Sequence, residues 1–285
     1  MSIPFKIEMA PNRLIRGELF PAHEPPQGTI IICHGFKGFK DWGFFPYVAN
    51  TLSSSLPLHV ITFNFSHNGV GDNPYEFTEL EKFAKNTYTK ELEDLDTLVQ
   101  AVRNHTLPLE NAQKNIELMP EPLFLLGHSR GGGVSLIYAF DHPEWIAGVI
   151  SWNGITNVDL FTEEQKHEMR EKGRTFIDNA RTGQKMPIDL EVIEDIEANQ
   201  ARFNIVERAK TTHVPIFLIQ GTDDHPRLIE GSQTLVNANP QIQWIKIPDG
   251  NHTFNAVHPF AGETKPLYEA IKHTEEAIKS IMQRR

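Results

Sequence analysis

The chain has 285 residues, 39% of them hydrophobic and 22% charged, which suits one large soluble domain with a sizeable core. Its 37 acidic and 27 basic residues give a formal net charge of −10, which argues against nucleic acid or an anionic membrane as the main partner. The single cysteine, Cys33, excludes an internal disulfide, and no apolar run is long enough to span a membrane. The N-terminus lacks the pattern of a signal peptide, so we expect a cytoplasmic protein.

Apolar runs and helical periodicity alternate along the chain. The strands expected in chain order are 5–9, 14–20, 29–33, 58–63, 123–126, 147–152, 214–220 and 243–247. The helices expected are 41–56, 85–103, 132–140 and 265–282. This alternation implies an α/β fold with a mostly parallel twisted sheet and helices on both faces. Function in such sheets lies at the carboxyl ends of the strands.

Residues 155–210 interrupt the alternation and are mostly polar. Thr162-Glu-Glu-Gln165 has the pattern of a capping box, and Gly173 is a plausible helix end. A hairpin around Thr182-Gly183 and a helix over 189–202 are expected to follow. We interpret 155–210 as a small cap inserted into a single domain, 1–285, and placed over the functional edge. The alternative is a surface elaboration without a role in binding.

The most informative motif is Gly127-His-Ser129-Arg-Gly131, which lies between a predicted strand and a predicted helix. A Ser inside Gly-x-Ser-x-Gly in that context is typical of a nucleophile elbow. Glycine neighbours let the strand and the helix pass closely, while the central residue takes a strained conformation. The alternative is a tight glycine turn with an incidental Ser.

A Ser nucleophile needs a base, and the base needs a group that orients it. Two later strands end in suitable loops: Gly221-Thr-Asp-Asp224 follows 214–220, and Asp249-Gly-Asn-His252 follows 243–247. The order Ser, acid, His agrees with the elbow motif. Asp249 is better explained as a turn residue.

These motifs, together with His34-Gly35-Phe36, resemble those of the α/β-hydrolase superfamily, and more narrowly those of serine hydrolases similar to dienelactone hydrolase and to cinnamoyl or feruloyl esterases. The resemblance implies the α/β-hydrolase fold, with Ser129 as nucleophile and His252 as general base. It implies Asp224 as the orienting acid, with Asp223 as the alternative. It also implies an oxyanion hole formed by the backbone N–H groups of Phe36 and Arg130. The side chains of those two residues need not matter.

The remaining histidines and the cysteine are given structural interpretations. His67, His213 and His225 lie near strand ends but lack the spacing of a zinc site, so we expect neither a metal nor a cofactor. His34 and His128 are expected to form structural hydrogen bonds. Cys33 ends an apolar strand and is expected to be buried.

The residues thus predict hydrolysis of a small-molecule carboxylic ester through an acyl-enzyme intermediate. A thioesterase or an acyltransferase would use the same three side chains. A ligand-binding protein that lacks catalysis is the hypothesis from another class. The acyl and alcohol groups and the oligomeric state are left open.

Overall fold

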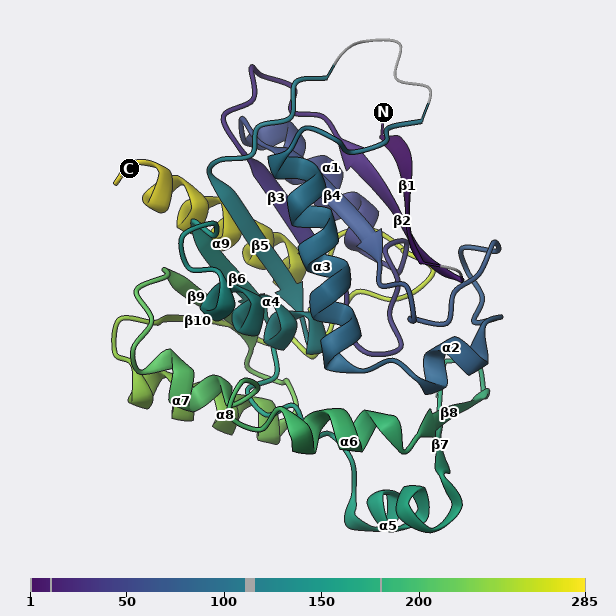
Figure 1. Ribbon diagram of the computed structural model, residues 1–285. Coiled ribbons are helices and arrows are strands. Elements are labelled where there is room, and N and C mark those ends of the chain that lie inside the picture. Colours follow the sequence, from purple (N-terminus) through teal and green to yellow (C-terminus); the bar gives the residue numbers. More distant parts are fainter. Residues whose placement is uncertain (1, 11, 111–115, 180, 285) are drawn as a thin grey trace.

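A sheet of eight strands forms the centre of the computed structural model, with helices on both of its faces (Figure 1). The structure describes residues 2–10, 12–110, 116–179 and 181–284. In spatial order the strands are β1 (Ile3–Ala10), β2 (Arg13–Phe20), β4 (His59–Asn64), β3 (Thr29–Cys33), β5 (Leu123–His128), β6 (Gly148–Trp152), β9 (Ile216–Gly221) and β10 (Gln243–Ile247). Every strand expected from the sequence is present, with ends within two residues of the prediction.

Strand direction places the functional edge. β2 pairs antiparallel with β1 and β4, and the other pairings in this sheet are parallel. β3, β5 and β6 are buried along their whole length, which explains why their sequences are mostly apolar. Because the strands from β4 to β10 run the same way, their carboxyl ends meet at one edge of the sheet.

Each face of the sheet has its own apolar core. On one face, α1 (Phe45–Ser55) and α9 (Lys265–Met282) contribute to an apolar cluster that includes Ile30 and Ile32 of β3. On the other face, α3 (Tyr88–Arg103), α4 (Arg130–Asp141) and α8 (Pro226–Ala238) contribute to a second cluster, which includes Ile31. Successive residues of β3 therefore point into opposite cores, as a pleated strand requires. No helix in the described part of the chain has the length and apolar character that crossing a membrane needs.

Several helix boundaries differ from the prediction for local reasons. The helix predicted from residue 41 begins at Phe45, because Gly43 has a φ of +46° that a right-handed helix does not allow. The helix predicted from residue 85 begins at Tyr88, because the Thr87 side chain caps it by accepting from Lys90 N–H at 3.2 Å. A short helix, α2 (Leu80–Ala84), precedes it. The closing helix over 265–282 is confirmed, whereas α2 and α8 were not predicted.

The polar segment 155–210 forms elements of its own beside the sheet. The predicted capping box is present at the start of α5 (Glu163–Lys172), and Gly173 ends that helix with a φ of 78°. The predicted hairpin is formed by β7 (Arg174–Asp178) and β8 (Lys185–Asp189). The helix predicted to end at residue 202 is α6 (Glu191–Ala198), and a short helix, α7 (Ile205–Ala209), follows.

A third apolar cluster joins this segment to the rest of the molecule. Met169, Met186 and Val192 from the segment pack with Phe39 of the loop after β3 and with Phe83 of α2. Lys37 of the same loop donates to the Asp178 carbonyl at 3.1 Å. The segment is thereby in contact with the loop that carries Phe36.

Candidate active site

Ser129 occupies a strained turn between β5 and α4. Its φ of 56° and ψ of −120° lie outside the regions that residues with a Cβ readily adopt. Its N–H donates to the Trp152 carbonyl at 2.9 Å, which ties the turn to the end of β6. Its carbonyl accepts from Gly132 N–H at 3.0 Å and from Ile155 N–H at 3.1 Å. The strained elbow predicted from the sequence is confirmed, with the Ser129 side chain half-buried at the carboxyl edge of the sheet.

Two glycines allow the loop after β3 to reach this turn. A Cβ on Gly131 would lie 2.2 Å from the Cys33 carbonyl oxygen, and a Cβ on Gly35 would lie 2.9 Å from the Cβ of Ser129. Contacts this short leave no room for a side chain at either position. The glycines therefore bring the His34-Gly35-Phe36 loop directly against the Ser129 turn.

The structure brings Asp224 and His252 together. Asp224 follows β9, His252 lies in the loop after β10, and the His252 Nδ1 atom is 2.7 Å from Asp224 Oδ1. The Asp224 side chain is fully buried, and it also accepts from Gln220 Nε2 at 3.0 Å and from the His225 amide at 2.8 Å. Burial alone would raise the pKa of Asp224, but these hydrogen bonds outweigh it and hold that pKa below its usual value. Asp223 is exposed and points its carboxylate at Thr222 instead.

The ionised carboxylate fixes the orientation of the imidazole. Because the carboxylate only accepts, His252 Nδ1 carries the proton and Nε2 keeps its lone pair. The His252 carbonyl accepts from His128 Nε2 at 2.8 Å and from Asn153 Nδ2 at 2.9 Å, which anchors the loop. The rings of His128 and His252 lie 4.9 Å apart, so His252 stands next to the residue that precedes Ser129. Within the described residues, no hydrogen bond yet joins the Ser129 hydroxyl to the imidazole.

The backbone N–H groups of Phe36 and Arg130 flank this turn. Arg130 is the first residue of α4, where an N–H has no intrahelical acceptor. Phe36 lies directly after the glycine that contacts Ser129. In the part of the chain that the structure describes, neither N–H has a protein acceptor. Both donors are thus available beside the serine.

Three polar residues that the sequence interpretation did not identify as part of the site support it. Asn153 donates to the His252 carbonyl, while its side-chain oxygen accepts from Gly221 N–H at 2.9 Å, so it bridges the loops after β9 and β10. Gln220 holds the second carboxylate oxygen of Asp224. His128, expected only to form a structural hydrogen bond, supports His252 directly. A signal existed for Gln220, because it is a polar residue in an otherwise apolar strand.

His34 and His128 are both buried and neutral. His34 donates from Nδ1 to the Gly35 carbonyl and accepts at Nε2 from Phe65 N–H, so a second ring proton would face another donor. Burial, together with the charge of Arg130, lowers the pKa of His34 to about 4. Burial and the neighbouring His252 lower the pKa of His128 to about 3. The structural hydrogen bonds expected for these histidines are confirmed.

One group of potential metal ligands coincides with this site. Asp224, His225 and His252 have ligand atoms within 4.8 Å of one another. The Asp224 carboxylate already accepts three hydrogen bonds and is shielded from solvent, which favours its role as the partner of the imidazole. Among the described residues, His67 and His213 join no such group.

Cys33 is buried as predicted, and burial raises the pKa of its thiol to about 12.

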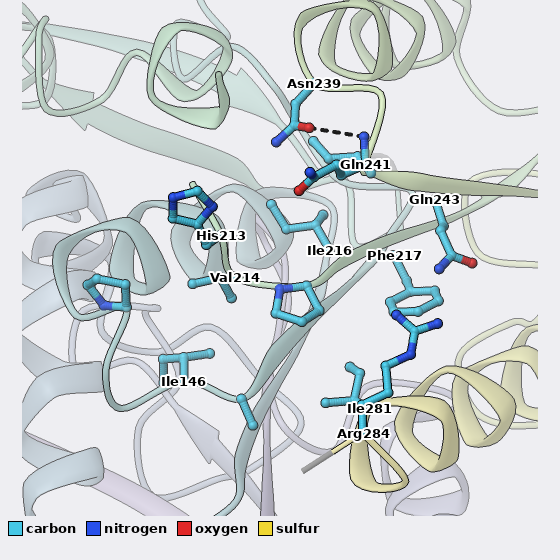
Figure 2. Close-up of a pocket in the computed structure, with 14 residues that line it drawn as sticks. Ile146, His213, Val214, Ile216, Phe217, Asn239, Gln241, Gln243, Ile281 and Arg284 are labelled. Atoms are coloured by element: carbon cyan, nitrogen blue, oxygen red, sulfur yellow. Dashed lines mark hydrogen bonds between the residues drawn. The ribbon is translucent and has the colours of Figure 1, made fainter. Parts of the chain in front are cut away.

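A well-formed cavity of about 540 Å³ lies elsewhere (Figure 2). It is lined by residues at the amino ends of β6, β9 and β10 and at the end of α9, including Ile216, Gln243 and Ile281. Ser129, Asp224 and His252 follow the carboxyl ends of strands in the same sheet. The cavity is therefore at the opposite edge and does not belong to the candidate site.

Comparison with known proteins gives four similarities. A family model described as "Putative esterase" matches residues 12–271. Est1E from Butyrivibrio proteoclasticus, in a structure with ferulic acid bound, has a TM-score of 0.68 at 16% identity, over 96% of this chain and 99% of that one. A dienelactone hydrolase from Anabaena variabilis has a TM-score of 0.60 at 13% identity, over 98% and 97%. The predicted α/β-hydrolase fold is confirmed.

A curated relative matches a shorter stretch. A monoglyceride lipase homolog from monkeypox virus is 25% identical over 162 residues, which make up 57% of this chain and 50% of that protein. The match thus spans about half of the relative's length.

The strain at Ser129 predicts a difference between two substitutions. Ser129→Gly removes the Cβ that makes the turn unfavourable, whereas Ser129→Ala keeps it. We expect the glycine variant to have a free energy of unfolding about 1 kcal/mol higher than the alanine variant, measured by urea denaturation. Equal stabilities would mean that the turn stores no strain.

The two neutral histidines predict a loss of stability in acid. Histidine in the unfolded chain has a pKa of about 6.5, so lowering the pH protonates His34 and His128 more readily in the unfolded state than in the folded state. Their contribution is complete above about pH 6.5 and is lost as the pH falls toward about 4 and 3. We expect a loss of about 2 kcal/mol for each histidine between pH 7 and pH 5, measured by urea denaturation. His128→Gln retains a donor for the His252 carbonyl but cannot be protonated, so the free energy of unfolding of this variant should fall less between pH 7 and pH 5. An equal fall in the wild type and the variant would contradict the neutral state assigned to His128.

Proposed function

Because this chain belongs to the esterase family whose model it matches, we propose that it hydrolyses carboxylic esters with Ser129 as the nucleophile. One observation carries the proposal: the buried Asp224 carboxylate holds the His252 imidazole at 2.7 Å, with Nε2 free, on the edge of the sheet where Ser129 projects. An imidazole held in this way is able to accept a hydroxyl proton. The small-molecule ester is the expected partner.

In acylation, one group must accept the serine proton while others stabilise the negative charge on the carbonyl oxygen. The Ser129 oxygen attacks the ester carbonyl while its proton moves to His252 Nε2, and Asp224 stabilises the resulting imidazolium. The N–H groups of Phe36 and Arg130 accommodate the negative charge that forms on the carbonyl oxygen. When the tetrahedral intermediate collapses, the bond to the alcohol oxygen breaks and Nε2 returns the proton to the leaving alcohol.

Deacylation repeats the same steps with water. His252 removes a proton from a water molecule as its oxygen attacks the acyl carbonyl, and the second tetrahedral intermediate releases the acid as Ser129 regains the proton. No step consumes a cofactor. The same residues would cleave a thioester or pass the acyl group to another acceptor. An assay with ester and thioester substrates, each with and without an added alcohol as acceptor, separates these activities.

We also propose that residues 155–210 act as the cap of this site. The contact between Lys37 and the Asp178 carbonyl and the cluster around Phe39 support this role, since both connect the segment to the oxyanion loop. A segment in this position would border the space that the substrate occupies. In Est1E a bound ferulic acid is known, and aryl esters therefore belong in the substrate panel.

Replacement of the nucleophile tests the proposal directly. Ser129→Ala should abolish hydrolysis of nitrophenyl acetate, because no other group in the mechanism attacks the carbonyl. A fluorophosphonate probe should label the wild type and leave the variant unlabelled, as read by mass spectrometry. The backbone turn is preserved, so thermal unfolding should change little. Turnover retained by the folded variant would refute the assignment of Ser129.

The two adjacent aspartates provide a matched pair for the acid. Asp224→Asn should lower kcat at least a hundredfold, because an amide no longer holds the imidazole in its working tautomer. Asp223→Asn makes the same chemical change at an exposed position and should leave kcat within about threefold of the wild type. Steady-state kinetics on both variants give the two kcat values. A larger loss of kcat in Asp223→Asn than in Asp224→Asn would identify Asp223 as the orienting acid.

A further inference from the structure

The Arg130 side chain is buried, although the residue was expected to contribute only its backbone. The side chain is 2% exposed, and its Nε atom donates to Glu91 Oε2 of α3 at 2.9 Å. Its Nη2 atom donates to the Asn86 carbonyl at 3.0 Å, and the Asn86 side chain donates to Glu91 Oε1 at 2.7 Å. Three residues thus form a closed hydrogen-bonded group under the start of α4.

The face of the guanidinium contacts the oxyanion loop. The Arg130 Cζ atom lies 3.9 Å from the ring centre of Tyr88 and 5.3 Å from the ring centre of Phe36. Phe36 in turn stacks on Phe83 of α2 at 5.4 Å. The side chain of Phe36 is therefore held between a cation and an aromatic ring.

The same two residues carry the proposed oxyanion donors. Arg130 supplies one of these N–H groups, and its side chain contacts Phe36, which supplies the other. On the basis of the proposed function, we propose that the Arg130–Glu91 ion pair positions the two N–H groups relative to each other. The ion pair does not touch the substrate in this proposal. It acts through the backbone of Phe36 and Arg130, so Glu91 is a positioning residue.

Burial energetics argue against stability as the main purpose of this pair. Burial raises the pKa of the Glu91 carboxyl, and the charge of Arg130 works against that rise. A buried pair of this kind is often replaced by apolar residues without loss of stability, whereas removing one partner leaves an unpaired buried charge. An ion pair at this position fits a geometric role, because small displacements of oxyanion donors are costly in rate.

The test removes both charges together. In Arg130→Met/Glu91→Leu, we expect kcat to fall by about tenfold to a hundredfold with KM within about threefold of the wild type. Affinity for an aryl trifluoromethyl ketone, which forms a tetrahedral adduct, should fall in parallel with kcat/KM. Hydrogen–deuterium exchange at the Phe36 amide should become faster. Glu91→Gln, which keeps the size of the side chain, replaces the double variant if that one does not fold.

The control is a second ion pair, which joins Arg13 of β2 to Asp94 of α3, the helix that also carries Glu91. Arg13 Nη2 contacts Asp94 Oδ1 at 3.0 Å, the Asp94 side chain is fully buried, and neither residue touches Phe36. Arg13→Met/Asp94→Asn should leave kcat, inhibitor affinity and Phe36 exchange near wild-type values. If Arg130→Met/Glu91→Leu matches this control in turnover and inhibitor affinity, the proposal is overturned, whatever the melting temperatures.

Failure of the proposed function gives a different result. A wild type that neither hydrolyses esters nor takes the fluorophosphonate label refutes the esterase mechanism. The exchange rate of the Phe36 amide then decides alone whether the ion pair holds the loop, and an unchanged rate overturns that as well.

Discussion

A carboxylate without solvent exposure is the constraint on which the rest of the site depends. The side chain of Asp224 is fully buried, and in that position a charge persists only if donors surround it. Gln220, the His225 amide and His252 provide them. The need of this carboxylate for a donor determines which ring nitrogen of His252 bears the proton, and therefore which one keeps its lone pair in the neutral ring.

The sheet makes that arrangement rigid. β9 and β10 pair in parallel up to Gly221 and Ile247, so the loops that follow them start side by side. Asn153, at the end of β6, bonds to both loops. The buried strands fix where these two loops begin, while polar contacts such as those of Asn153 fix the position of the side chains that the loops carry. A reactive group can thus lie on a loop and still be held by the core.

Local patterns explain how much of this could be predicted from the sequence. Continuous apolar runs identified the strands, and the Gly-x-Ser-x-Gly context identified the strained turn at Ser129. Helix starts were missed where one residue decides them, as at Gly43 and Thr87. The contact of Arg130 with Glu91 joins residues 39 positions apart on different helices. Such a pairing leaves no local periodicity, so the sequence indicated a backbone role alone.

The charges around the serine suit a reaction that creates one cation and one anion. His34 and His128 are neutral, and the charge of Arg130 is balanced by Glu91. Among these described groups, Asp224 thus carries the charge that is left unbalanced by a second ionised side chain. In the proposed mechanism its counterion is the imidazolium that forms on His252, so charge separation would add no new unpaired buried group. A neutral His128 beside His252 also matters, because a second cation 4.9 Å away would oppose proton transfer from the serine.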